Sequence, residues 1–215
     1  MELAKYFMEV FSAVIVILNP FGAALIFVSL TAGDTRKDLI KKSRRTALTV
    51  IITLFTFMFV GQFIFDLYQI TLDAFRIAGG VLLFGMGLSM IQGQHPQSKI
   101  TDKERAEVVD QDDISIIPMG IPVLSGPASI AAMMVYRSEA EQTSEIVMLI
   151  TAVLVAGIIV FFTLKYAHIM VNRFGKTTLR IISRIMGLLV VTMAVQFIIS
   201  GMTAVAHNAF PGIFN

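Results

Sequence analysis

The chain has 215 residues, of which 56% are hydrophobic and 15% are charged, and its mean hydropathy is +0.79. These values are far from those of soluble domains and are typical of a membrane protein. The formal net charge of +2 gives no reason to expect a nucleic acid as partner, and the lack of cysteine excludes disulfides, thiolate metal sites and cysteine nucleophiles.

Six apolar runs contain no Asp, Glu, Lys or Arg. They cover residues 10–30, 46–65, 77–91, 114–135, 146–164 and 185–206. Each is close to the ~20 residues that a helix needs to cross a bilayer, although the third is shorter. The sequence therefore predicts an all-α membrane protein with six transmembrane helices.

The first run is interrupted by Asn19-Pro20-Phe21-Gly22. An unpaired amide in the membrane interior costs about 1–3 kcal/mol, so Asn19 should have a hydrogen-bond partner. In one interpretation Asn19 only caps a second half-helix, with Pro20 in the first helical position. In the other, the half-helix that begins at Phe21 also points free N–H groups into a cavity. The two interpretations are compatible.

The second and third runs carry small and hydroxyl side chains at helical spacing. Thr46, Thr49, Thr53 and Thr56 share one face of the second helix, which favours helix packing; a polar lining of a permeation path is the alternative. The third run contains Gly79, Gly80, Gly85, Gly87 and Ser89. We expect close packing there, with Gly85 and Ser89 forming a small-xxx-small pair.

Residues 93–113 form the only long polar segment and read as a cytoplasmic connector. The connector divides the chain into a first three-helix repeat, 1–92, and a second, 114–215. Because each repeat has an odd number of spans, the second must be inverted relative to the first. A polar stripe of Thr192, Gln196, Ser200 and Thr203 follows one face of the last helix.

The fourth run opens the second repeat and cannot be one unbroken helix. It contains Pro118, Gly120, Pro122, Gly126 and Pro127. Proline removes a backbone donor and clashes with the preceding turn, so a break is expected. Four of the six prolines thus lie in the first and fourth runs, at corresponding places in the two repeats. Paired interrupted helices are the best sequence indication of a transporter's binding site.

Basic residues predict the orientation. One set of loops carries Arg36, Lys37, Lys41, Lys42, Arg44, Arg45, Lys99, Lys103, Arg105, Lys165, Arg173, Lys176, Arg180 and Arg184, whereas the other side has Lys5, Arg76 and Arg137. The positive-inside rule therefore places both termini outside the cytoplasm.

The ends of interrupted helices can bind a small zwitterion. Free N–H groups near Gly22 and Ala128 would hold a carboxylate, and carbonyls near Leu18, Leu124 and Ser125 would hold an ammonium group. No ionisable side chain lies at mid-membrane, so a substrate with net charge would lack a counter-ion.

Several motifs resemble the MarC family of integral membrane proteins. They are Asn19-Pro20, FRIAGG at 75–80, PMGIP at 118–122 with SGP at 125–127, and RIMGLL at 184–189. The resemblance extends over nearly the whole chain. It implies a six-helix protein of the bacterial inner membrane with discontinuous helices one and four, multi-pass, with periplasmic termini by the charge rule. Its characterised relatives, the SnatA-type carriers, transport small neutral amino acids such as glycine and alanine.

By that resemblance, nine residues at the two breaks map onto the substrate site. They are Asn19, Pro20, Phe21, Gly22, Ser125, Gly126, Pro127, Ala128 and Ser129. Ala128 stands where the family usually has glycine, which narrows the second break, and Gly120 stands where alanine is common.

The resulting expectation is a secondary transporter, working as an exporter, with a small zwitterionic substrate, a coupling proton or cation, and the lipid bilayer as partners. The alternative is an integral membrane protein without transport activity, with a structural or assembly role, whose breaks serve packing. An enzyme is not expected, because Ser125 and Ser129 have no histidine or lysine base in the same span. No cofactor or metal is expected.

Overall fold

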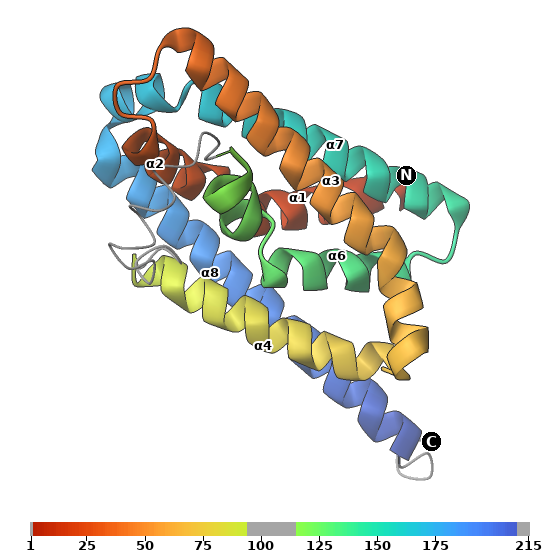
Figure 1. The fold of residues 1–215 in the computed structure, drawn as a ribbon. Helices are drawn as coiled ribbons and strands as arrows, with labels where there is room; N and C mark the ends of the chain where they lie inside the picture. The colour runs from red at the N-terminus through yellow and green to blue at the C-terminus, as the bar shows by residue number, and fades with distance from the viewer. Residues whose placement is uncertain (1, 94–114, 210–215) are drawn as a thin grey trace.

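The protein is described by a computed structural model that covers residues 2–93 and 115–209. Every regular element in these two ranges is a helix (Figure 1). In chain order they are α1 (Glu2–Leu18), α2 (Pro20–Leu30), α3 (Arg36–Tyr68), α4 (Leu72–Ile91), the π-helix η2 (Ser115–Leu124), α6 (Pro127–Glu139), α7 (Thr143–Lys165) and α8 (Ala167–Ala209). The predicted all-α class is confirmed. The predicted connector, except for residue 93, lies outside the described residues.

Within the described ranges, five helical segments are long and apolar enough to cross a membrane. They are Leu3–Leu30, Arg36–Tyr68, Leu72–Ile91, Thr143–Lys165 and Ala167–Ala209. The predicted span 114–135 is not among them, because Ser125 and Gly126 separate two shorter helices, η2 and α6. The count of six spans and the inverted repeat stay predictions.

The helices run back and forth along a bundle (Figure 1). The first turns of α1 and α4, the start of α7 and the end of α8 lie at one end, which we call the Arg76 end. The start of α3 and the turn from α7 to α8 lie at the other, the Lys42 end. The basic residues of 36–45 and 165–176 therefore share one end, as the orientation argument requires. The membrane side that this end faces stays a prediction.

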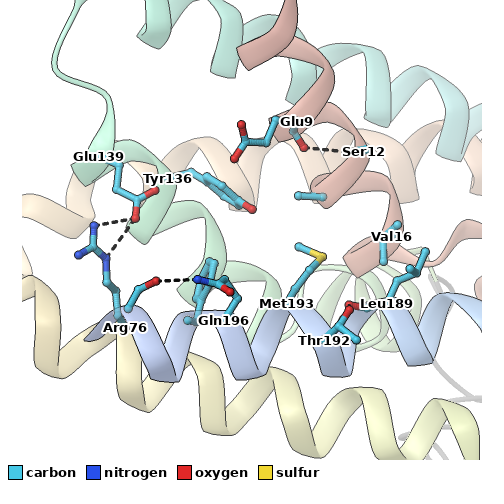
Figure 2. A pocket seen from close by; sticks show the side chains of 13 residues that line it. Glu9, Ser12, Val16, Arg76, Tyr136, Glu139, Leu189, Thr192, Met193 and Gln196 are labelled. Carbon is cyan, nitrogen blue, oxygen red and sulfur yellow. Dashed lines mark hydrogen bonds and ion pairs between the residues drawn. The ribbon is translucent and has the colours of Figure 1, made fainter. Parts of the chain in front are cut away.

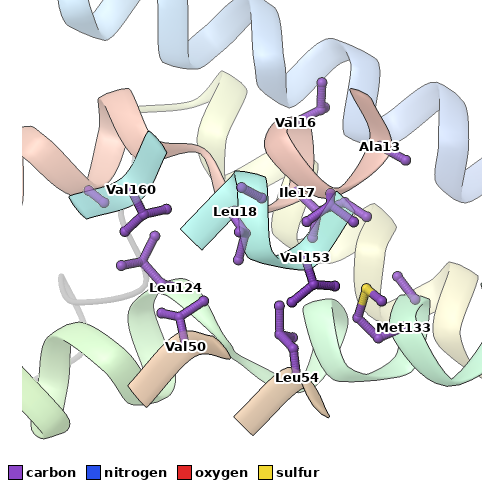
Figure 3. Packing of buried hydrophobic residues seen from close by; sticks show 14 of the residues in the cluster. Ala13, Val16, Ile17, Leu18, Val50, Leu54, Leu124, Met133, Val153 and Val160 are labelled. Carbon is purple, nitrogen blue, oxygen red and sulfur yellow. The ribbon is translucent and has the colours of Figure 1, made fainter. Parts of the chain in front are cut away.

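The interrupted first helix lies in the centre of the bundle. In the most apolar 18-residue stretch of Leu3–Leu30, 67% of the residues are buried, whereas the corresponding stretch of α8 has 22% of its residues buried. Around Ile17 and Leu18 the core gathers side chains from other helices, among them Leu54, Leu124 and Val153 (Figure 3). The segment with the first interruption is therefore shielded from lipid by its neighbours.

Helices α4 and α8 approach each other closely. A Cβ atom on Gly80 would lie 2.8 Å from the Ala194 carbonyl, and one on Gly87 would lie 2.9 Å from the Gly187 carbonyl. The predicted role of small residues in this helix is thus confirmed at these positions. It is wrong at Gly85, where no described residue comes within 4 Å of an added Cβ.

The threonine face of α3 packs against other helices. Thr46 and Thr53 are buried, and Thr49 lies so close to η2 that a Cβ on Gly120 would come within 2.5 Å of its Cγ2. Thr56 donates its hydroxyl to the Ile52 carbonyl of its own helix. These contacts support the packing interpretation of the stripe rather than a polar path.

Candidate functional site

The first interruption is a single residue with left-handed backbone. Asn19 has φ 43° and ψ 63°, and it separates α1 from α2. Helical hydrogen bonds nevertheless cross it, from the Asn19 N–H to the Ile15 carbonyl at 3.0 Å and from the Ala23 N–H to the Asn19 carbonyl at 3.1 Å. Pro20 follows in the first helical position and contributes no N–H. The break therefore redirects the helix without opening a gap.

The side chain of Asn19 is hydrogen-bonded at both ends. Its Oδ1 accepts from the Gly22 N–H at 3.2 Å, and its Nδ2 donates to the Ser183 hydroxyl of α8 at 2.7 Å. A Cβ on Gly22 would collide with the Asn19 amide and lie 2.9 Å from the Ser183 Oγ. The expected partner of Asn19 is therefore confirmed. The expectation that the Gly22 N–H is available for a carboxylate is wrong in this structure.

The second interruption is longer. The Ser125 N–H and its hydroxyl both donate to the Gly120 carbonyl, at 3.0 and 2.7 Å, and the Ser129 hydroxyl donates to the Leu124 carbonyl at 2.9 Å. Helix α6 then begins at Pro127 after Gly126, which supplies no side-chain cap. The first N–H groups of α6 thus lack the side-chain acceptor that α2 has in Asn19.

The two interruptions lie side by side in the core. Helix α2 packs against η2, and α1 packs against α6. A cavity of about 30 Å³ is lined by Asn19 and Gly22 from the first interruption and by Val123 from η2. A second cavity, of about 10 Å³, is lined by Leu18 and by Ser129. Together they have room for about one or two water molecules, so the site is closed in this structure.

The nine predicted site residues are distributed around this contact. Asn19, Pro20, Gly22, Ser125, Ala128 and Ser129 are buried, Phe21 and Gly126 are half-buried, and Pro127 is exposed. Asn19, Gly22 and Ser129 line the two small cavities. Ser183 was missed by sequence reasoning, because it lies between Arg180 and Arg184 and nothing local distinguishes it.

A much larger cavity opens at the Arg76 end between α1, α4, α6 and α8, and we call it the vestibule (Figure 2). Its volume is about 460 Å³. Polar residues that line it include Glu9, Ser12, Tyr136, Thr192, Gln196 and Ser200. The predicted stripe of α8 therefore faces the vestibule, except for Thr203. Val16 also lines it, and only two residues, Ile17 and Leu18, lie between Val16 and Asn19, a helical rise of about 4–5 Å.

An ion pair joins α4 to α6 at the wall of the vestibule. The Glu139 Oε1 accepts from the Nη2 and Nε of Arg76 at 2.7 and 3.1 Å, and Asp73 accepts from the Nη1 at 3.3 Å. Sequence reasoning treated Arg76 only as a charge outside the membrane and did not pair it with Glu139, because 63 residues separate them. The one signal for Arg76 was its place in the FRIAGG motif.

Comparison with known proteins assigns the sequence to a family. A family model described as "MarC family integral membrane protein" matches residues 4–206. The chain is 37% identical to the UPF0056 membrane protein MJ1677 of Methanocaldococcus jannaschii over 197 residues, which are 92% of this chain and 96% of that protein. It is 29% identical to the UPF0056 membrane protein YhcE of Escherichia coli over 211 residues, which are 98% and 94% of the two chains.

No solved structure matches the chain significantly. The family model covers both interruptions, the ion pair and most of α8. This protein therefore belongs to the MarC family of integral membrane proteins.

Proposed function

We propose that the protein is a secondary transporter, working as an exporter, of small neutral amino acids such as glycine or alanine. In this proposal six transmembrane helices form two inverted repeats in a bacterial inner membrane, with both termini periplasmic. The observation that carries the proposal is the meeting of two helix interruptions in the buried core, with one cavity lined from both sides. Interrupted helices at a repeat interface supply backbone groups of both signs to a substrate.

The uncapped start of α6 is the better place for a substrate carboxylate. The N–H groups of Ala128 and Ser129 have no side-chain cap, whereas Asn19 occupies the corresponding position of α2. The positive end of the helix dipole stabilises an anion there. The ammonium group would bind the Leu124 carbonyl, which now accepts the Ser129 hydroxyl. A bound substrate would thus replace the hydrogen bond from the Ser129 hydroxyl to the Leu124 carbonyl with one from its own ammonium group.

The size of the core cavities limits the substrate and requires motion. A volume of about 30 Å³ does not hold an amino acid, so the interruptions must separate for binding. The vestibule would give access from the Arg76 end, and rocking of the two repeats would open the Lys42 end. Ala128 is buried, so little room remains for a side chain larger than a methyl group.

The alternative without transport activity also has an observation in its favour. Asn19, Ser125 and Ser129 already have hydrogen-bond partners inside the protein, as packing devices should. Flux measurements separate the two functions. Proteoliposomes that contain the protein should take up labelled glycine or alanine, and an imposed proton or sodium gradient should accelerate this flux if that ion is coupled. Folded protein that moves no small neutral amino acid in either direction would rule out the transporter.

A further inference from the structure

The vestibule contains a fixed hydroxyl without a protein partner. Tyr136 of α6 is 8% exposed, and Figure 2 shows its hydroxyl directed into the vestibule. Its ring packs edge-on against Phe197 with 5.9 Å between the centroids. No residue in 2–93 or 115–209 forms a hydrogen bond with this hydroxyl. Because the hydroxyl faces the vestibule and not a protein partner, it is available to an occupant of the vestibule.

The vestibule also contains an acid that is not neutralised by the protein. Glu9 of α1 lines it, and no ion pair or side-chain hydrogen bond joins its carboxylate to the described part of the chain. Glu139, by contrast, is paired with Arg76 at 2.7 Å. Glu9 is therefore the vestibule carboxylate that is left to bind a cation or a donor group.

These two groups complement the two ends of an amino acid. An ammonium group donates to a carboxylate, and a phenol donates to a carboxylate of the ligand. Ala13, Val16 and Met193 supply an apolar wall beside them, which suits a small aliphatic side chain. The vestibule, at about 460 Å³, has room for a small amino acid with water, which the cavities at the interruptions lack.

We propose that the vestibule is a second, outer amino-acid site, in which Glu9 binds the ammonium group and the Tyr136 hydroxyl binds the carboxylate. The substrate class rests on the proposed function. In this arrangement an amino acid passes between the vestibule and the interruptions, and Val16 lies on the short stretch of α1 that separates them.

Two substitutions test the site with little effect on packing. Tyr136→Phe keeps the ring contact with Phe197 and removes only the hydroxyl, and Glu9→Gln removes the charge. Tyr6→Phe is the matched control for the first, because the Tyr6 hydroxyl has no described partner either, but it is buried away from the vestibule. Glu141→Gln is the control for the second, because Glu141 is exposed near the same end and outside the vestibule.

Glycine and alanine are the probes. Their dissociation constants are measured on purified full-length protein, and their half-saturation concentrations are measured from each face of oriented proteoliposomes. We expect Tyr136→Phe and Glu9→Gln each to raise the dissociation constant, and the half-saturation concentration at the Arg76 face, about tenfold. The maximal rate should stay within about twofold, and both controls should match the wild type.

The possible outcomes separate the two proposals. If the wild type transports and neither variant changes binding or half-saturation at the Arg76 face, the outer site is refuted and the transporter stands. If the variants lower only the maximal rate, the two residues do not bind substrate and the outer site is also refuted. If both variants weaken binding but the wild type moves no amino acid, the outer site stands and the transporter fails. If the wild type neither binds nor transports glycine or alanine, both proposals fail.

Discussion

The two helix interruptions differ in how they satisfy the backbone groups that a break in a helix leaves unpaired. At the first, one left-handed residue redirects the helix, backbone hydrogen bonds cross it, and the Asn19 side chain caps α2 and reaches Ser183. At the second, a π-helix ends at Leu124 and α6 starts at Pro127 without a side-chain cap. Serine hydroxyls satisfy carbonyls there, but no side chain caps the first N–H groups of α6.

This difference assigns different roles to the two breaks. The first is tied to α8 and its polar groups are already paired, so it acts as a fixed wall of the site. The second keeps backbone donors for a ligand. Sequence reasoning treated the two breaks as equivalent binding ends. In the proposed transporter the site would therefore be asymmetric, with the substrate carboxylate at Ala128 and Ser129, which have no side-chain cap, rather than at Gly22, which Asn19 caps.

The largest effect is expected from Gly22→Ala. The added methyl group would collide with the Asn19 amide and lie 2.9 Å from the Ser183 Oγ, so the cap of α2 must shift. We expect a loss of about 2–3 kcal/mol in the free energy of unfolding and a loss of transport. Unfolding in mixed micelles measures the first and proteoliposome flux the second.

Gly85→Ala is the matched control for that substitution, because no described residue lies within 4 Å of its added Cβ. We expect no loss of stability at this position. Equal stability of the two alanine variants would mean that the first interruption is not rigid.

The pair Asn19→Ala and Ser183→Ala tests whether the first interruption is fixed by α8. Each variant removes one side of a buried hydrogen bond of 2.7 Å, and Asn19→Ala also removes the cap on Gly22. We expect losses of about 1–2 kcal/mol for each. In a double-mutant cycle the two effects should overlap by about 1 kcal/mol, because they report one contact. Strictly additive losses would show that the contact contributes nothing.

Ser129→Ala probes the second interruption, with Ser138→Ala as control. Both hydroxyls donate to a backbone carbonyl at 2.9 Å, but only Ser129 reaches back across the interruption, to Leu124. We expect both variants to lose at most about 1 kcal/mol of stability. Only Ser129→Ala should change the half-saturation concentration for alanine, by several-fold. Equal transport by the two variants would contradict a ligand site at the start of α6.

The smallest effect is expected from Pro127→Ala. Pro127 is exposed in the first helical position, where its missing N–H has no intrahelical partner in any case. We expect a change of stability below about 0.5 kcal/mol, measured in the same micelles. Flux should fall modestly, because alanine relaxes the restriction on Gly126 and lets α6 extend toward η2. If Pro127→Ala lost more stability than Asn19→Ala, the second interruption and not the first would be the stiffer of the two.

Local chemistry explains what could be predicted from the sequence. Asn19 before Pro20, and Gly126 before Pro127, specify a cap and a helix start within a few residues, and both breaks lie where they were predicted. The apolar runs likewise predicted the helices that contain them. The need for a partner at Asn19 followed from the cost of burying an amide.

Long-range packing explains what was missed. The partner of Asn19 is 164 residues away, and the Arg76–Glu139 pair spans 63 residues, so no spacing rule could find them. The vestibule is lined by residues of four helices, α1, α4, α6 and α8, that are far apart in the sequence. We expected Gly85 to lie in a helix contact, but Gly80 and Gly87 form the side of α4 that meets α8 and Gly85 does not. Periodicity alone does not say which side of a helix meets its neighbour.

The backbone contact between α4 and α8 constrains how the molecule can change shape. Where Gly80 and Gly87 touch the carbonyls of α8, there is no side chain that could rotate to let one helix slide past the other. Any turn of one predicted repeat against the other must therefore keep this contact, because α4 belongs to the first repeat and α8 to the second. Pivots for such a turn are available at their ends, at Gln69 before α4 with φ 55° and at Gly175 within α8 with φ 80°.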